Sequence, residues 1–261
     1  MSSNLPRGLL ALELLTRTPG GLPLHALATE LQVPRSTAHR ILAELVDAGF
    51  VRQQDGDFSP YGLTLKLATL GMQFLSATGV VELVQPVLDK LAAASGELAR
   101  MSLVENDRLI WVAKAQGAQG GLRYDAQSDP GEDVRLFCSS NGQAWLSTLS
   151  DQKALEIVAR QGFGEPGQYG PNAPRTIEAF LDSLRLARER GYAIVHETYE
   201  IGLAAIAAPV LGTKAGAPAI GAVSIAGPEA RMKHADHLVP LIQDAARELS
   251  ALSPGLLACG R

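Results

Sequence analysis

The sequence predicts an α+β chain built from two domains, and three observations support this prediction. The 261 residues suit two small domains better than one. Residues 1–61 have the pattern of short helices followed by a β-hairpin. Residues 80–258 alternate between helical segments and strand-like segments that can pair as hairpins. Strands that meet as hairpins beside helices are typical of the α+β class.

Composition indicates an ordinary globular protein. Apolar residues make up 46% of the chain and charged residues 19%. The longest apolar runs fall short of the roughly 20 residues that cross a bilayer, and residues 1–6 do not resemble a signal peptide. Two cysteines, Cys138 and Cys259, are too few for a disulfide framework or a thiolate metal site. We therefore expect a cytoplasmic protein with no membrane partner and no cofactor.

Three short helices are predicted at the start of the chain. Residues 7–17 are dense in leucine and end before a Pro-Gly-Gly breaker. A second helix fits residues 24–31, whose apolar positions follow the i, i+3, i+4, i+7 spacing. A third helix fits residues 34–48, because Pro34 suits a first helical turn and Gly49 suits the position after the last turn.

The third predicted helix has one apolar face and one polar, partly cationic face. The polar face carries Ser36, His39, Arg40, Ala43 and Asp47. Only two residues separate this helix from the second one. Two short helices joined by a tight turn, the second with a polar outer face, match a helix-turn-helix.

A β-hairpin is predicted directly after these helices. Phe50-Val51-Arg52-Gln53-Gln54 and Asp57-Phe58-Ser59 have the character of extended segments. Asp55-Gly56 between them is one of the strongest short hairpin signals. A hairpin that follows a recognition helix is a wing. The sequence therefore predicts a winged helix-turn-helix DNA-binding domain over residues 1–61.

A linker helix and a second domain follow. Apolar residues recur at helical spacing over residues 62–77 and Gly79 can end the helix, so we predict a linker helix over residues 62–79. The second domain is predicted over residues 80–258. Its predicted helices cover residues 81–94, 141–149, 151–161, 176–190 and 235–252. Its predicted strands cover residues 100–104, 109–113, 192–197, 204–210 and 219–226.

Motifs between residues 33 and 231 share their order and spacing with one protein family. In the helix-turn-helix they are Val33-Pro34-Arg35-Ser36-Thr37-Ala38-His39-Arg40-Ile41-Leu42, Leu45 and Gly49-Phe50-Val51. In the linker and the next helix they are Leu67, Gly71, Pro86, Leu88, Leu91 and Ser95-Gly96-Glu97. In the second domain they are Ser140-Asn141-Gly142-Gln143-Ala144, Arg188, Gly191-Tyr192-Ala193, Glu197, Gly202, Ile206-Ala207-Ala208-Pro209-Val210, Val223-Ser224, Gly227-Pro228 and Arg231. In these motifs the chain resembles the IclR family of bacterial transcriptional regulators.

The resemblance implies a fold and a function. Members of this family have a GAF-like effector-binding domain, in which a curved antiparallel sheet flanked by helices cups a small ligand. They usually form dimers through the DNA-binding half and tetramers through the sensor. The resemblance therefore implies a ligand-responsive regulator whose partners are double-stranded operator DNA, a small organic acid effector and further copies of the chain.

Candidate DNA-contacting residues lie in the first two turns of the third helix and in the wing, where groove and backbone contacts are expected. They are Arg35, Ser36, Thr37, His39, Arg40 and, in the wing, Arg52. The alternatives are that Ser36 only caps the helix and that Arg35 and Arg52 are only solvated.

Charge in the first domain favours an oligomer. Residues 1–60 hold five arginines and no lysine against six acidic residues. Sequence-independent affinity for DNA comes from neutralised phosphates. One such domain should therefore bind weakly, and useful affinity needs a dimer or a higher oligomer.

Candidate effector-binding residues lie in the second domain. Ser139-Ser140-Asn141-Gly142 precedes a predicted helix whose N–H groups could receive a carboxylate, and an ordinary helix cap is the alternative. Glu197 and Ser224 belong to motifs of the resemblance, and Ser224 lies on a strand that lines the pocket in family members. Val195 and Ala205 stand near positions where small-acid sensors of the family often carry an acidic residue and a cysteine.

The apolar character of Val195 and Ala205 leaves a small polar acid without a charged partner. We therefore expect an aromatic or otherwise apolar carboxylic acid, held near Asn141 and Gly142. The residues available as apolar walls are Trp111, Leu122, Phe137 and Trp145. Burial in the core is the default for any tryptophan.

Two other functions stay open. One is a ligand-independent DNA-binding regulator that acts through protein partners. The other is an enzyme such as a hydrolase, for which Cys138 and His196 are the available nucleophile and base. The sequence has no Gly-x-Ser-x-Gly motif, and we expect no enzyme activity. His234 and His237 lack further ligands at suitable spacing, so we expect no metal site.

Overall fold

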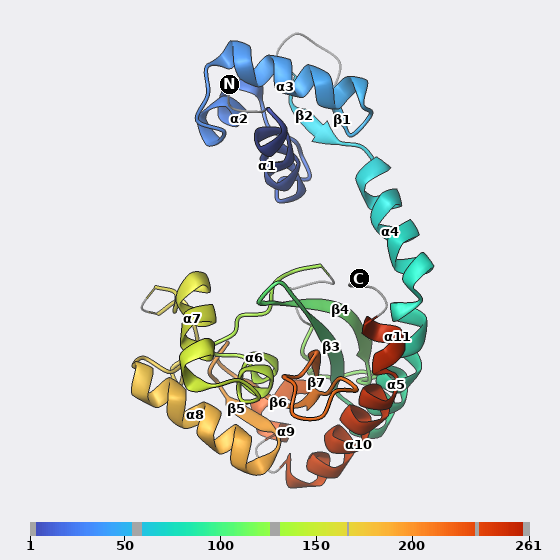
Figure 1. Cartoon of the computed structure of the whole chain (residues 1–261), viewed down its shortest axis with the longest axis vertical. Helices are drawn as coiled ribbons and strands as arrows, with labels where there is room; N and C mark the ends of the chain where they lie inside the picture. Colours follow the sequence, from blue (N-terminus) through green and yellow to red (C-terminus); the bar gives the residue numbers. More distant parts are fainter. Residues whose placement is uncertain (1–3, 54–58, 126–130, 166, 233–234, 258–261) are drawn as a thin grey trace. The chain divides into compact units, whose positions relative to one another are not determined.

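The structure is a computed structural model that describes residues 4–53, 59–125, 131–165, 167–232 and 235–257. The chain divides into two compact units, Met1–Ala77 and Thr78–Arg261 (Figure 1). Each unit has an apolar core of its own. The first is a helix-turn-helix unit and the second an antiparallel sheet with helices, which confirms the predicted α+β class.

The first unit contains three helices and a two-stranded sheet. The helices are α1 (Leu5–Thr16), α2 (Leu24–Glu30) and α3 (Arg35–Asp47), and the strands are β1 (Val51–Gln53) and β2 (Tyr61–Leu63). Every one of these elements contributes to the core, whose buried residues are Leu12, Leu15, Leu27, Leu42, Val51 and Tyr61. Helices this short are marginal alone, so the shared core is what stabilises them.

The second strand of the wing lies later in the chain than predicted. β2 pairs with β1 in antiparallel register, whereas the sequence pattern placed the second strand at residues 57–59. The predicted Asp55-Gly56 turn lies outside the described residues. Tyr61 fixes the observed position, because its side chain is buried and its backbone exchanges hydrogen bonds of 2.8 and 2.9 Å with Leu22.

The linker helix is α4 (Lys66–Thr78), which begins later than residue 62. The ladder with β1 extends through Leu63, so the predicted end of the first domain at residue 61 falls inside a strand. The Lys66 ammonium donates to the carbonyl of Ala48 over 2.6 Å and ties the start of α4 to the end of α3. β2 is too short to show the alternation of a strand in the sequence. The apolar residues at helical spacing over residues 62–77 therefore led to a predicted helix that includes its last two residues.

Most apolar side chains of α4 are exposed, and none of its residues is buried. They include Leu70, Met72 and Phe74. No single helix among the described residues is long and apolar enough to cross a bilayer. The bent pair of α4 and α5 (Val80–Ser95) meets that criterion by length and composition only when the two helices are taken together.

The second unit is built on a five-stranded antiparallel sheet of order β4-β3-β7-β6-β5. The strands are β3 (Leu98–Glu105), β4 (Arg108–Gln116), β5 (Ala193–His196), β6 (Leu203–Val210) and β7 (Gly221–Pro228). The predicted strands of this domain are all present, with ends shifted by a few residues. β3 pairs with β7, so strands from the two halves of the unit meet in the middle of the sheet.

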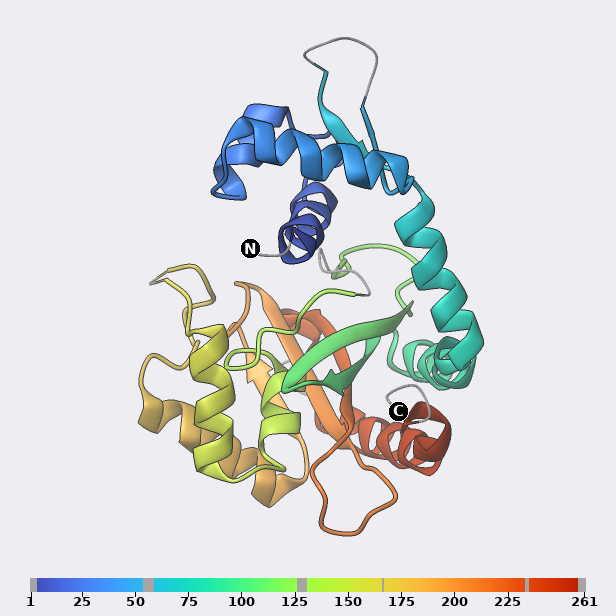
Figure 2. The same ribbon diagram turned by 45° about the horizontal axis from the view of Figure 1, so that its top comes forward.

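Helices cover both faces of this sheet (Figure 2). α5 and α10 (Leu238–Ala251) pack on one face around a core that includes Leu88, Ile206 and Ile242. The helices α6 (Ser140–Leu146), α7 (Asp151–Gln161) and α8 (Ile177–Arg190) lie on the other side. Short turns complete the unit, namely α9 (Glu229–Met232), the 3-10 turn η1 (Ala235–His237) and α11 (Ser253–Leu257).

Candidate functional site

The polar face of α3 is exposed to solvent, as its sequence pattern predicts. Its candidate DNA-contacting residues are the exposed Arg35, Ser36, His39 and Arg40 and the half-buried Thr37. Its buried residues are Ala38, Ile41 and Leu42. The apolar stripe therefore holds the helix on the unit, and the cationic stripe faces outward.

The turn between α2 and α3 sets this orientation. Gln32 adopts the left-handed region with a φ of +52°, and the amide of Val33 donates to the carbonyl of Ala28 over 3.0 Å. Pro34 precedes α3 with an extended backbone and provides no side-chain cap. Ser36 lies inside the helix, so capping is not its role.

Arg52 in the wing is exposed on β1, where it pairs across the ladder with Gly62. A glycine opposite leaves no side chain on that part of β2 to cover the arginine. Arg52 and the cations of α3 thus present their charges to solvent from one compact unit. Exposed arginines on a recognition helix and on its wing suit contacts with bases and phosphates.

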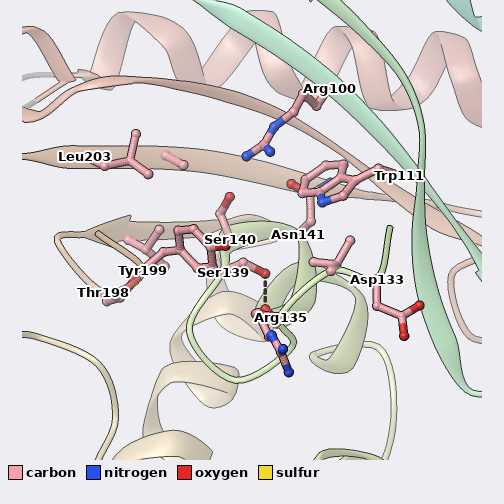
Figure 3. Close-up of a pocket in the computed structure, with 13 residues that line it drawn as sticks. Arg100, Trp111, Asp133, Arg135, Ser139, Ser140, Asn141, Thr198, Tyr199 and Leu203 are labelled. Carbon is pink, nitrogen blue, oxygen red and sulfur yellow. Dashed lines mark hydrogen bonds between the residues drawn. The ribbon is translucent and has the colours of Figure 1, made fainter. Parts of the chain in front are cut away.

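A pocket lies in the second unit, on the side of the sheet that α6 covers (Figure 3). Its main polar residues are Arg100, Asp133, Arg135, Ser140, Asn141 and Thr198. Its main apolar and aromatic residues are Trp111, Val195, Tyr199, Leu203 and Ala205. The interior leaves about 30 Å³ for water, which is room for one or two water molecules. A ligand much larger than water does not fit within this interior volume as it stands.

Arg100 on β3 extends into this pocket (Figure 3) and is only 8% exposed. Its guanidinium carbon lies 3.9 Å from the centre of the Trp111 ring and 5.7 Å from that of Tyr124. Burial lowers the pKa of Arg100, while the neighbouring Tyr124 and Tyr199 act in the opposite direction. A guanidinium stays protonated in proteins, so the pocket contains a buried positive charge.

The irregularity in the β3–β4 ladder places Trp111 beside this arginine. The register shifts between Met101 and Ser102, after which Ser102 stands opposite Trp111. The indole therefore lies on the pocket face rather than in the core under α5. A bulge commonly re-aims a side chain at a binding site in this way.

Asn141 on α6 faces Arg100 from the opposite wall (Figure 3). Its Nδ2 donates to Ser102 Oγ and to the carbonyl of Ala222, both over 2.9 Å. A carbonyl can only accept, so this contact fixes the orientation of the amide. Among the described residues Asn141 Oδ1 and Ser224 Oγ are buried without a hydrogen-bond partner. Ser224 pairs with Arg100 across the β3–β7 ladder and so shares its face of the sheet.

The structure separates the predicted effector-binding residues into two groups. Ser140, Asn141, Val195 and Ala205 line the pocket. Gly142, Glu197 and Ser224 are not part of its lining. Because Ser224 lies beside Arg100 under the same face of the sheet, it stays a neighbour of the pocket.

Gly142 and Glu197 have other contacts. The Gly142 amide donates to Ser139 Oγ over 3.1 Å, which is the helix cap that the sequence left as the alternative. A Cβ at Gly142 would lie 2.2 Å from the carbonyl oxygen of Leu136, so the glycine allows the close approach of that segment. The Glu197 carboxylate accepts from the amide of Gly202 over 2.9 Å. Neither residue is placed to hold a carboxylate in the pocket.

The predicted apolar walls are partly wrong. Trp111 lines the pocket, whereas Phe137 and Trp145 are buried in the core that residues of α6, α7 and α8 form. Leu122 is 70% exposed. The structure adds Tyr199, which follows β5 and whose position beside the pocket no local pattern indicates.

The sequence predicted no charged residue facing the effector, whereas the structure places the buried Arg100 in the lining of the pocket. The sequence contained a signal for this residue. Arg100 and Ser102 are polar residues with period two inside an otherwise apolar strand, and a charge in such a strand indicates a functional site.

The other charged residues of the pocket point elsewhere (Figure 3). The Asp133 carboxylate is held by Arg108 through hydrogen bonds of 2.9 to 3.1 Å. The Arg135 side chain is exposed and points away from Arg100. The buried charge inside the pocket is therefore that of Arg100.

The two residues considered for an enzyme, Cys138 and His196, each have surroundings of their own. Burial raises the pKa of the Cys138 thiol to about 12, so it is not a thiolate at neutral pH. His196 Nδ1 lies 3.0 Å from a carboxylate oxygen of Glu229. Within the described part of the chain, no group of three or more potential ligands could hold a metal ion, and His234 lies outside that part.

Comparison with known proteins agrees with this architecture. Residues 5–55 match the IclR helix-turn-helix domain, and residues 72–251 match the domain described as bacterial transcriptional regulator IclR C-terminal. The DNA-binding transcriptional repressor YiaJ of Escherichia coli is 28% identical over 249 residues, which cover 95% of this chain and 87% of that protein. The acetate operon repressor of Salmonella typhimurium is also 28% identical, over 95% of this chain and 88% of that protein.

Solved structures share the fold over nearly the whole chain. An IclR transcriptional regulator from Alicyclobacillus acidocaldarius has a TM-score of 0.79 at 23% identity and covers 96% of this chain and 98% of its own. An IclR homologue from Microbacterium hydrocarbonoxydans, complexed with 4-hydroxybenzoate, has a TM-score of 0.77 at 19% identity and covers 98% and 100%. With both of its domains matched in order, the chain belongs to the IclR family of DNA-binding transcriptional regulators.

Proposed function

We propose that this regulator binds operator DNA through α3 and the wing, and that a small organic acid bound in the second unit changes its affinity for that DNA. The observation that carries the proposal is the pocket, which combines a buried cation with aromatic and aliphatic walls. Pockets of this composition hold small molecules, because the apolar wall provides affinity and a few polar groups fix the orientation.

The DNA-binding half of the proposal rests on the exposed face of α3. Arg40 lies in the second turn of the helix, where a guanidinium can reach a guanine edge or a phosphate. Arg35, Ser36, Thr37 and His39 surround it, and Arg52 contacts the DNA backbone from the wing. The roughly balanced charge of this domain makes a single copy a weak binder.

A dimer or tetramer provides the missing affinity. Exposed apolar side chains on α1 and α4 support association of copies through this half of the molecule; they are Leu5, Leu9, Leu70, Met72 and Phe74. Paired recognition helices read two half-sites at a fixed separation, so a small change in their spacing alters the affinity for the operator.

The effector proposed is an aromatic or otherwise apolar carboxylic acid. The relative from Microbacterium hydrocarbonoxydans was solved with 4-hydroxybenzoate, which makes hydroxybenzoates reasonable first probes. The interior volume of the pocket is small, so we expect such an acid to displace part of the wall on entry. Movement of the wall is how its binding can bias the packing of the second unit, and α4 connects that unit to the DNA-binding one.

An Arg40→Ala substitution tests the DNA-binding half of the proposal. We expect it to weaken specific binding by about 1–3 kcal/mol, the typical loss of one bidentate base contact. The measurement is fluorescence anisotropy of labelled DNA from the region upstream of the protein's own gene, at several salt concentrations.

The matched control is Arg17→Ala, which removes another exposed arginine of the same unit, directly after α1. An equal loss in both variants would show that only the overall charge matters and would contradict the role of Arg40. If the DNA affinity of the wild type responds to no acid, the alternative of a ligand-independent regulator with protein partners takes the place of the sensor.

A further inference from the structure

Among the described residues that line the pocket, Arg100 differs from the other charged ones in its burial and direction. Asp133 is already held by Arg108, and Arg135 points away from the interior. Arg100 is the charged residue that is both buried and directed inward (Figure 3). A cation in a cavity with low-dielectric walls concentrates a positive potential there. The ligand that complements this field is an anion.

The contact between Arg100 and Trp111 also favours anions of one shape. The guanidinium carbon lies over the Trp111 ring, 3.9 Å from its centre. The N–H donors of a guanidinium lie in its own plane, in a fork that matches the two oxygens of a carboxylate. Trp111 thus holds the plane of this fork in a fixed direction. A planar, bidentate acceptor fits it better than a compact or neutral group.

On the opposite wall, Asn141 has an oxygen that can accept a hydrogen bond from a ligand. Asn141 Oδ1 is a buried acceptor without a hydrogen-bond partner in the described residues, and the contact of Nδ2 with the carbonyl of Ala222 prevents the amide from reversing. A buried acceptor without a donor is costly, so a ligand hydroxyl that reaches it gains affinity. Aromatic and aliphatic side chains, including Tyr199 and Leu203, also line the pocket that Arg100 and Asn141 share.

Building on the sensor function proposed above, we infer that Arg100 binds the carboxylate of the effector and that Asn141 accepts a hydrogen bond from a hydroxyl of the same ligand. The effector is accordingly a hydroxylated aromatic carboxylic acid. Its carboxylate lies at the β3 side of the pocket and not at the start of α6, where Ser139 already caps the helix.

The test is a binding titration of the full-length protein by calorimetry. The probes are benzoate, 4-hydroxybenzoate, phenylacetate and 4-hydroxyphenylacetate, each beside its primary amide, which has the same shape without the charge. We expect the acids to bind and their amides to bind about 10- to 100-fold more weakly, as for the loss of a charge-assisted hydrogen bond. Each hydroxylated acid should bind more tightly than its parent, and Asn141→Ala should remove that difference.

The protein variants are Arg100→Gln, Arg100→Lys and Arg185→Gln. Arg100→Gln should bind the acids about 10- to 100-fold more weakly, and Arg100→Lys should fall between it and the wild type because it keeps the charge without the fork. Arg185 is exposed on α8 outside the pocket, so its loss should leave the affinity unchanged. Circular dichroism melts without ligand check that each variant is folded.

Measuring both acid binding and DNA affinity distinguishes a failure of the Arg100 assignment from a failure of the proposed sensor function. Amides that bind as tightly as acids, equal binding by the wild type and Arg100→Gln, or no binding by any acid would overturn the assignment of Arg100. DNA affinity is measured on the same samples. Acid binding that needs Arg100 but leaves DNA affinity unchanged would support the assignment and contradict the sensor function.

Discussion

Desolvation acts on both Cys138 and Arg100, with different chemical results. Burial raises the pKa of the thiol and keeps it neutral, so the side chain behaves as a small apolar group. The guanidinium cannot lose its proton at neutral pH, so its charge persists inside the pocket. The same physical effect therefore keeps Cys138 neutral and leaves Arg100 as the buried charge that we propose binds an anion.

Cys138 should resist thiol reagents while the protein is folded. In a Cys259→Ser variant it is the only thiol, and with a pKa of about 12 roughly one part in ten thousand is thiolate at pH 8. We expect no labelling by a thiol-reactive dye over an hour in buffer and complete labelling in denaturant. Rapid labelling of the folded protein would show that the thiol is accessible and would reopen the question of a nucleophile.

Sequence pattern identified some site residues and missed others for physical reasons. The exposed face of α3 follows helical periodicity, so its polar residues could be predicted directly. Ser140 and Asn141 were found through their motif. Arg100 was missed because period-two alternation shows which residues share a face but not which helix covers it.

At the scale of single elements, α6 shows how a short helix depends on its surroundings. Its seven residues are all buried, and Ser139 caps its first turn. Gly142 lies in this turn against the backbone of Leu136. The position was predicted as a carboxylate contact, whereas its physical role is to let two backbone segments approach closely. Helix propensity and local packing therefore oppose each other at this residue.

Two substitutions of helical glycine by alanine should have opposite effects. Alanine is favoured over glycine within a helix by about 1 kcal/mol. Gly71 in α4 has no neighbour among the described residues within 4 Å of where a methyl group would lie, so Gly71→Ala should stabilise the protein by about 0.5–1 kcal/mol. Gly142→Ala should instead destabilise it by about 2 kcal/mol or more, because the methyl would overlap a backbone carbonyl.

Urea unfolding followed by circular dichroism measures both changes. The two tryptophans, Trp111 and Trp145, both belong to the second unit, so their fluorescence reports its unfolding separately. Stabilisation by Gly142→Ala would contradict the close packing of α6 on the segment before it.

The wing shows where sequence reasoning stops at the element scale. Asp55-Gly56 indicated a hairpin, and β1 does pair with a second strand. That strand begins at Tyr61, because a buried tyrosine and its backbone contact with Leu22 stabilise the register. The contact joins segments far apart in the chain, and local periodicity does not contain such information.

At the scale of the whole molecule, the two candidate sites lie in different units. The first unit carries exposed cations on α3 and β1, and the second contains the pocket. The order of the motifs along the chain predicted this architecture, because each motif marks an element of its own unit. The polar residues of β3 mark Arg100 in the sequence, but its place in the pocket depends on several strands and a helix meeting in space, which the folded structure shows.

The most direct test combines both units in one titration. Fluorescence anisotropy of a labelled operator fragment is followed while 4-hydroxybenzoate and the other acids that bind are added to the wild type and to Arg100→Gln. We predict that at least one acid shifts the DNA affinity of the wild type by about fivefold or more, within the typical range of allosteric coupling, and that Arg100→Gln does not respond at the same concentration. An equal shift in both proteins, or no shift by any acid that binds the wild type, would contradict a sensor that reads a carboxylate through Arg100.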